Sequence, residues 1–150
     1  MTYFRCKTLL LAMLAMAPLA WAHDNATLDA TKSPKGGQLR MAGAYHYELL
    51  VAPPGKQAQV SPVVVWVTDH AGAKVSTAGA TGTATLLSGA KKTTVTLRPD
   101  TDNRMKGEGA YLASTDMKVI VSITLAGSPA VATRFTPLTG ARPDDHAAHQ

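Results

Sequence analysis

The sequence predicts a single all-β domain, an antiparallel β-sandwich of the immunoglobulin-like kind with about seven to eight strands and flexible ends. Three observations lead to this prediction. Short runs of alternating apolar and polar residues follow one another between residues 38 and 137. Gly, Pro and Asp separate these runs at intervals of about ten residues. No long amphipathic pattern lies between the runs, which excludes the helical crossovers that a parallel sheet needs.

The first two expected strands differ in how they should be buried. Residues 45–52 alternate between apolar and polar side chains and end at the turn formers Pro53-Pro-Gly55. Residues 63–67, Val-Val-Val-Trp-Val, are apolar on both faces, which predicts a central strand with Trp66 as a core anchor. The segment Asp69-His-Ala-Gly72 follows as a tight turn, whose glycine supplies the positive φ.

Five further strands are expected after this turn. The clearest is 117–125, in which Val, Ile and Leu side chains point to one face while Lys, Ser and Thr point to the other. Residues 94–98 and 130–136 alternate in the same way, so we expect one face of each strand in the core and the other in water. Residues 80–87 and 106–113 complete the set.

The first 22 residues have the three-part layout of a secretory signal peptide. Arg5 and Lys7 precede an apolar run, and small side chains end the segment at Ala22. We therefore expect cleavage between Ala22 and His23. The apolar run is too short for a membrane anchor, which needs about 20 apolar residues, so no membrane span is expected after cleavage.

Removal of residues 1–22 from the 150 leaves 128, enough for one domain of ordinary size. Within them, residues 23–37 are expected to be a flexible leader, 38–137 the β-sandwich domain and 138–150 a disordered tail. The leader and the tail are polar and rich in turn formers, and they hold too few large apolar side chains to fold alone. Cys6, the single cysteine, leaves with the signal, which excludes disulfide bonds and thiolate metal sites.

Charge and motifs exclude two functional classes. The whole chain has 15 Lys and Arg against 10 Asp and Glu, and without Arg5 and Lys7 the balance is 13 against 10, or +3. These cations are scattered and lack the clustered patch with aromatic residues that nucleic-acid binding requires. The chain has no Gly-x-Ser-x-Gly elbow, no phosphate loop and no His-Glu-x-x-His motif. We therefore expect neither a nucleic-acid-binding protein nor an enzyme.

The histidines suggest metal chemistry, because all five follow the expected cleavage site. His23 would become the N-terminal residue, and its α-amine and imidazole would form a two-nitrogen chelate that suits Cu(II). The alternative is that His23 has no role in binding, because any residue can follow a cleavage site. His46 and Glu48 lie two residues apart in an expected strand, so their side chains leave from the same face at a spacing that suits two ligands of one metal. The alternative for this pair is a solvated His/Glu pair on the surface.

The tail segment Asp144-Asp-His-Ala-Ala-His149 places His146 and His149 beside two carboxylates. Even without regular structure, such a segment can wrap Cu, Zn or Ni as an exchangeable binder. The alternative is a solubilising polar tail. His70, in the expected turn, is predicted to be solvated.

Several segments together form a wider pattern: Pro34-Lys-Gly-Gly-Gln-Leu39, Tyr45-His-Tyr-Glu-Leu-Leu-Val51, Val65-Trp-Val-Thr-Asp-His-Ala-Gly72, Ala80-Thr-Gly-Thr-Ala-Thr-Leu-Leu87 and Asn103-Arg-Met-Lys-Gly-Glu-Gly109. The chain thereby resembles a group of small periplasmic proteins of Gram-negative bacteria. It also resembles the "His-Gly-Gly... Glu-Leu... Tyr-Val-Thr-Asp" module found in periplasmic adaptor subunits of heavy-metal efflux pumps. The likeness covers residues 34–137.

The resemblance implies a periplasmic β domain that is associated with copper, zinc, cobalt or cadmium handling and has no catalytic activity. One residue departs from the pattern, because this chain has Lys35 where the pattern reads Pro-His-Gly-Gly. A protonated lysine cannot coordinate a metal, so His46 and Glu48 would need other partners. The departure shifts weight to His23 and to the histidines of the tail.

Two functional hypotheses follow. In the first, the protein binds or buffers a heavy metal in the periplasm, with no obligatory cofactor, and passes the ion to a periplasmic adaptor of a metal efflux pump as part of efflux or resistance. In the second, it is a non-catalytic interaction or structural domain of the envelope that docks through a sheet edge or face, and its histidines are incidental. For the first hypothesis, Cu(II) or Zn(II) would be held by side chains drawn from His23, His46, Glu48, His146 and His149.

Overall fold

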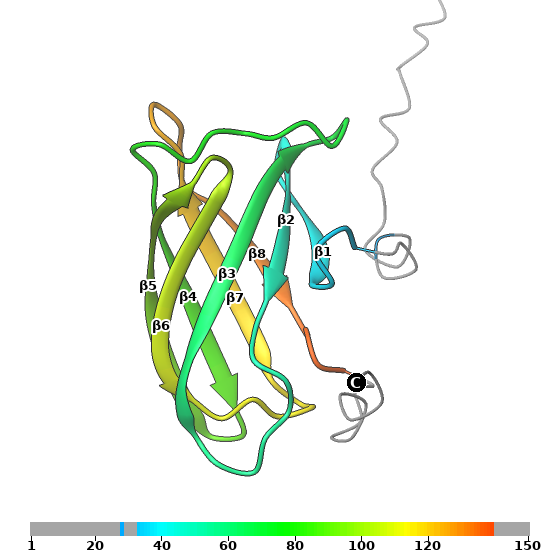
Figure 1. Cartoon of the computed structure of the whole chain (residues 1–150), viewed down its shortest axis with the longest axis vertical. Coiled ribbons are helices and arrows are strands. Elements are labelled where there is room, and N and C mark those ends of the chain that lie inside the picture. Colours follow the sequence, from blue (N-terminus) through cyan, green and yellow to red (C-terminus); the bar gives the residue numbers. More distant parts are fainter. Residues whose placement is uncertain (1–27, 29–32, 140–150) are drawn as a thin grey trace, which may run out of the picture.

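The computed structural model of the chain describes Leu28 and residues 33–139. These residues contain eight strands, all paired antiparallel (Figure 1). The predicted class, all-β with antiparallel strands, is confirmed. The strands are β1 (Gln38–Ala42), β2 (Tyr45–Leu50), β3 (Gln59–Asp69), β4 (Thr81–Ser88), β5 (Lys91–Thr101), β6 (Arg104–Tyr111), β7 (Lys118–Thr124) and β8 (Val131–Phe135).

Hydrogen bonding joins the eight strands in one continuous order, β1-β2-β3-β6-β5-β4-β7-β8. The sheet curls until its two edge strands, β1 and β8, approach each other (Figure 1). A hydrogen bond from the amide of Thr136 to Oε1 of Gln38, 2.8 Å long, ties these two edges together. The result is a nearly closed barrel, so the two separate sheets of the expected sandwich are not established by this arrangement.

Strand β5 joins the two parts of the curled sheet. Its first part pairs with β4 and its last part, from Arg98 onward, pairs with β6, with a register irregularity between Pro99 and Thr101. Strand β6 packs closely there, because a Cβ added at Gly107 would lie 2.2 Å from the carbonyl oxygen of Thr96. Because β5 pairs with both β4 and β6, the strands form one curled sheet, although their apolar and polar alternation would also suit a sandwich.

The barrel interior is filled by the alternate apolar residues of the strands. On β3 the interior receives Val63, Val65 and Val67, and this central strand pairs with β2 and β6 as its apolar run predicts. Trp66 is not part of this core. It lies half-buried on the outer face, opposite Glu48 of β2, so the expectation of a core anchor is wrong. Other fully buried side chains are Tyr47, Leu49, Leu86, Val95, Leu97, Met105, Met117, Ile123 and Phe135.

Two buried tyrosines differ in how their hydroxyl groups are satisfied. Tyr111 of β6 donates to the carbonyl of Pro62, at 2.7 Å, and accepts from the amide of Ala52, at 3.0 Å. Tyr47 of β2 is equally buried, but its hydroxyl has no hydrogen-bond partner among the described residues. Burial, with a smaller contribution from Tyr45, raises the pKa of Tyr47 from 10.0 to about 12.

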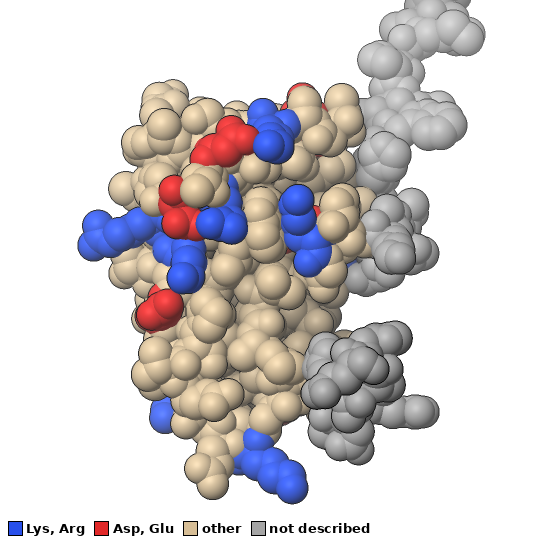
Figure 2. All heavy atoms as spheres, viewed as in Figure 1, with Lys and Arg blue, Asp and Glu red and all other residues tan. Residues whose placement is uncertain are grey.

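Charged side chains on the outer surface are interleaved in sign. Figure 2 shows acidic and basic groups side by side in the upper part of one face, while its lower part is mostly uncharged. Ion pairs in the described part of the chain join Lys74 to Asp102, Arg104 to Asp100 and Lys106 to Glu108. Among the described residues, no helix is both long and apolar enough to cross a membrane.

Candidate metal site

Two histidine rings meet where β2 begins and β3 ends. His46 lies half-buried on the outer face of β2, opposite Thr68 of β3. His70 is exposed in the turn after β3. The two ring centroids are 4.8 Å apart and the ring planes are inclined by 72°. The structure therefore brings together two imidazoles that are separated by a whole strand in the sequence.

Three hydrogen bonds to Asp69 hold the turn that carries His70. Oδ1 of Asp69 accepts hydrogen bonds from the amides of Ala71 and Ala73, both at 2.8 Å. The amide of Gly72 donates to the carbonyl of Asp69 at 3.0 Å, and Gly72 has a φ of 81°. The tight turn predicted from Asp69-His-Ala-Gly72 is thus confirmed. A glycine is favoured here because other residues rarely adopt this φ, and the braced turn positions His70 over the start of β2.

Glu48 lies beside His46 on the outer face of β2, but its carboxylate has a structural role. The side chain is buried, and Oε1 accepts hydrogen bonds from the amide of Lys35, at 2.7 Å, and from the amide of Gly37, at 3.1 Å. A Cβ at Gly37 would lie 2.4 Å from the carbonyl oxygen of Leu49, so only glycine permits this close approach. Glu48 therefore holds the segment before β1 against β2, which leaves Oε2 as the oxygen it could offer to a metal.

A cavity of about 430 Å³ opens beside these groups. Its walls include Lys35, His46, Glu48 and Trp66. Lys35, which stands where the resembling pattern has a histidine, therefore lines the same cavity as His46. Trp66 forms part of this wall from the outer face of β3. The remaining wall residues come from the segment before β1, from β1 and β3, and from the turns near them: Pro34, Leu39, Thr68, Gly72, Lys74, Thr101, Asp102 and Asn103.

The structure places the predicted ligands in two groups. His46 and Glu48 share one face and one cavity, as their spacing predicts. His23, His146 and His149 lie outside the described residues. Within the described ranges, no three His, Cys, Asp or Glu side chains are grouped so as to hold a metal ion. In this part of the chain the candidate site thus rests on the two imidazoles of His46 and His70.

The exposed turn position of His70 agrees with the sequence prediction, but sequence reasoning did not foresee that its ring lies against that of His46. The contact between the two rings could not be inferred from sequence spacing, because it depends on the β2–β3 register. A shift of that register by one residue would move His46 to the other face. Sequence reasoning also missed Trp66, because an apolar run does not reveal which of its alternate residues face outward. No model of a known protein family matches the chain, and no curated protein matches it at a significant level.

Proposed function

We propose that the protein binds a divalent heavy metal, Cu(II) or Zn(II), in the periplasm through the imidazoles of His46 and His70, as a non-catalytic buffering or delivery protein. The observation that carries the proposal is the 4.8 Å contact between these two rings. Imidazole nitrogens bind Zn at about 2.0–2.1 Å. Rings this close together can share one ion once side-chain rotations direct one nitrogen of each ring at it.

The surroundings support an exchangeable site. His70 is exposed, so an ion can enter without opening the fold. Two nitrogens leave further coordination positions for water, for Oε2 of Glu48, or for His23 and the tail histidines. A metal held by few fixed ligands can be passed on, as a buffering protein that supplies an efflux adaptor requires.

The position of Lys35 supports a metal site beside His46, because both residues line the same cavity. The segment that contains Lys35 resembles part of the efflux adaptor module, which has a histidine where this chain has Lys35. The backbone of Lys35 is held by Glu48, at 2.7 Å from Oε1. The substitution Lys35→His would therefore add an imidazole at the wall that His46 already lines. We expect this variant to bind Zn(II) about tenfold more tightly, a gain of about 1.4 kcal/mol.

The test is isothermal titration of Zn(II) and Cu(II) into the protein beginning at His23, in a background where His23, His146 and His149 are alanine. Saturable binding with one ion per chain is expected. Either His46→Ala or His70→Ala should lower the affinity by about tenfold or more. Lys74→Ala is the matched control, because Lys74 lines the same cavity and cannot coordinate while protonated.

Three outcomes would overturn the proposal: no saturable binding in this background, unchanged affinity after both histidine substitutions, or an equal loss in the Lys74→Ala control. The second hypothesis, an envelope interaction domain with incidental histidines, would then gain support. Exposed outer-face residues such as Leu50 and Val60, which are 37% and 72% exposed, would be the first places to look for that contact.

A further inference from the structure

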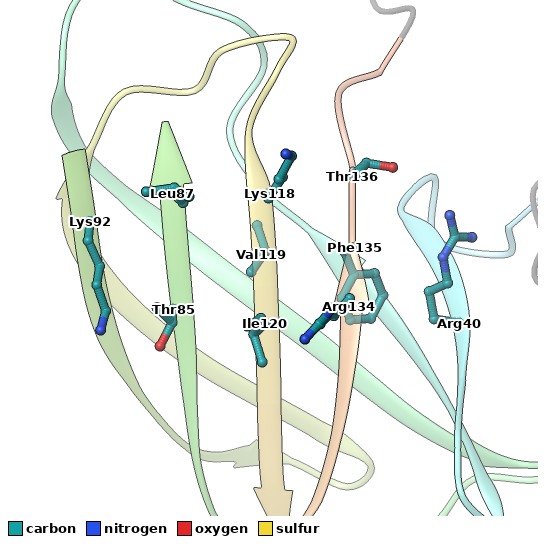
Figure 3. Close-up of a pocket in the computed structure, with 10 residues that line it drawn as sticks. All are labelled: Arg40, Thr85, Leu87, Lys92, Lys118, Val119, Ile120, Arg134, Phe135 and Thr136. Carbon is teal, nitrogen blue, oxygen red and sulfur yellow. The ribbon is translucent and has the colours of Figure 1, made fainter. Parts of the chain in front are cut away.

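A groove of about 450 Å³ crosses the outer side of β5, β4, β7 and β8 and reaches β1 (Figure 3). Its apolar lining includes Leu87 of β4 and Ile120 of β7, which are 40% and 42% exposed. In the described part of the chain, four large hydrophobic side chains are exposed to this degree, and two of them meet here. Neither His46 nor His70 lines the groove.

Cations surround this apolar strip. The strand registers set Leu87 between Lys92 on one side and Lys118 on the other, and they set Ile120 beside Arg134. Figure 3 shows these side chains around Leu87 and Ile120, with Arg40 of β1 at the far side of Phe135. The complete lining is Arg40, Thr85, Leu87, Lys92, Lys118, Val119, Ile120, Arg134, Phe135 and Thr136.

Acidic side chains among the described residues do not neutralise the positive charge of Lys92 and Arg134. No carboxylate of the described residues lines the groove. Within the same residues, no ion pair joins Lys92 or Arg134 to an acid. Asp116 lies near Lys118, but its main partner is Ser114, whose hydroxyl donates to Asp116 Oδ1 at 2.6 Å. An apolar strip inside a ring of cations is complementary to a ligand with an apolar body and an anionic end.

The backbone of β4 and β7 favours an acyl chain over a peptide in this part of the groove. Strands β4 and β7 are each paired on both sides, β4 with β5 and β7, and β7 with β4 and β8. A peptide strand laid over β4 and β7 would find no backbone partners there, and its own amides would lose water over the apolar side chains of Leu87 and Ile120. A hydrocarbon chain has no such groups to satisfy. The groove volume also lies toward the small end of the range of about 300–1,000 Å³ for ligand sites, which favours one chain over two.

We infer that this groove binds a fatty acid, with the hydrocarbon chain along Leu87 and Ile120 and the carboxylate among Lys92, Lys118 and Arg134. The inference is independent of the metal site, because the two sites share no lining residue. Binding is reversible and weakens as ionic strength rises, since the charges lie at the surface.

The test uses laurate, below the concentration at which it forms micelles, titrated into the full protein beginning at His23 and followed by methyl NMR. Saturable shifts of the Leu87 and Ile120 methyl signals are expected. Dodecyltrimethylammonium, which has the same chain length and a cationic head, should not produce them. Lys92→Glu should weaken laurate binding by about tenfold at low salt, and Ile120→Ser should weaken it at least as much.

Lys56→Glu is the matched control, because it makes the same change in net charge at an exposed lysine between β2 and β3 that does not line the groove. It should leave the laurate affinity within about twofold. The inference is overturned if laurate produces no saturable shifts, if both amphiphiles bind alike, or if Lys56→Glu weakens binding as much as Lys92→Glu. Saturable shifts with an acidic, apolar peptide but not with laurate would also overturn it and would assign the groove to a protein partner.

Discussion

The two buried tyrosines allow one chemical change to be made in two environments. Tyr111→Phe and Tyr47→Phe each remove a single hydroxyl from a side chain in the barrel interior. At Tyr111 the hydroxyl joins the carbonyl of Pro62 to the amide of Ala52. At Tyr47 it is buried without a hydrogen-bond partner among the described residues. The same substitution should therefore change stability in opposite directions.

The magnitudes follow from the two environments. Loss of a hydrogen bond costs about 1 kcal/mol, and more where the remaining group is fully buried. Ala52 is half-buried and Pro62 is exposed, so water can replace part of each lost bond. We therefore expect Tyr111→Phe to lower the free energy of unfolding by about 2 kcal/mol, or Tm by roughly 8 °C. Tyr47→Phe removes a desolvated hydroxyl and should raise the free energy of unfolding by about 1 kcal/mol.

The assay is urea unfolding at neutral pH, followed by far-ultraviolet circular dichroism, for the wild type and both variants. Equal m-values would show that the same surface is exposed in each case, so that midpoints can be compared directly. The reasoning is refuted if Tyr47→Phe destabilises the protein as much as Tyr111→Phe does, or if Tyr111→Phe has no effect. Either result would mean that the hydroxyl groups are not satisfied as described here.

Three further predictions concern the barrel. Gly107→Ala places a Cβ against the backbone of Thr96 and should destabilise the fold by about 3 kcal/mol or prevent it, as thermal unfolding would measure; near-normal Tm would contradict the close approach of β5 and β6. Because the fold raises the pKa of Tyr47 to about 12, the folded protein keeps this phenol neutral where the unfolded chain ionises, so the wild type loses stability as pH rises from 10.0 through 12. The free energy of unfolding of Tyr47→Phe should fall by about 3 kcal/mol less than that of the wild type over this interval, as denaturation and phenolate absorbance would measure. Equal losses in the two proteins would exclude Tyr47 as the cause. Asn103→Ala removes the 2.8 Å bond from Nδ2 to the carbonyl of Val67 and should cost about 1–2 kcal/mol in urea unfolding, whereas an unchanged midpoint would show that this buried bond contributes nothing.

Alternation was sufficient to locate most of the strands. The segment 117–125 contains β7, and the wholly apolar 63–67 lies inside β3, because burial on one or both faces leaves a direct mark on the sequence. Strand β1 was not distinguished as a separate strand. It is five residues long and contains Arg40, which is buried at 6% exposure despite its charge.

The closure of the sheet was harder to foresee, because it depends on pairing between strands that are distant in sequence. Strand β5 changes partner near Pro99, and Gly107 permits the close contact that lets the sheet bend. A sandwich and a barrel share the same alternation of residues along each strand, so periodicity does not separate them.

The candidate site likewise combines a local feature that the sequence predicted with a long-range contact that it did not. The spacing of His46 and Glu48 correctly placed both on one face, because side chains alternate strictly along a strand, whereas the cavity that both line was not predicted. The meeting of His46 with His70 depends on the β2–β3 register and on a turn braced by Asp69. Neither is a local property of the residues involved. The proposed ligands His23, His146 and His149 lie outside the described residues, and their participation remains a prediction.

The most direct test of the metal proposal is to observe the imidazole nitrogens of His46 and His70 by ¹⁵N NMR during titration with Zn(II), with His23, His146 and His149 replaced by alanine. We predict that one nitrogen of each ring shifts along the same saturation curve, because both bind a single ion. If only one ring responds, or if neither does while the protein remains folded, the two histidines are not a shared metal site and the proposed function is wrong.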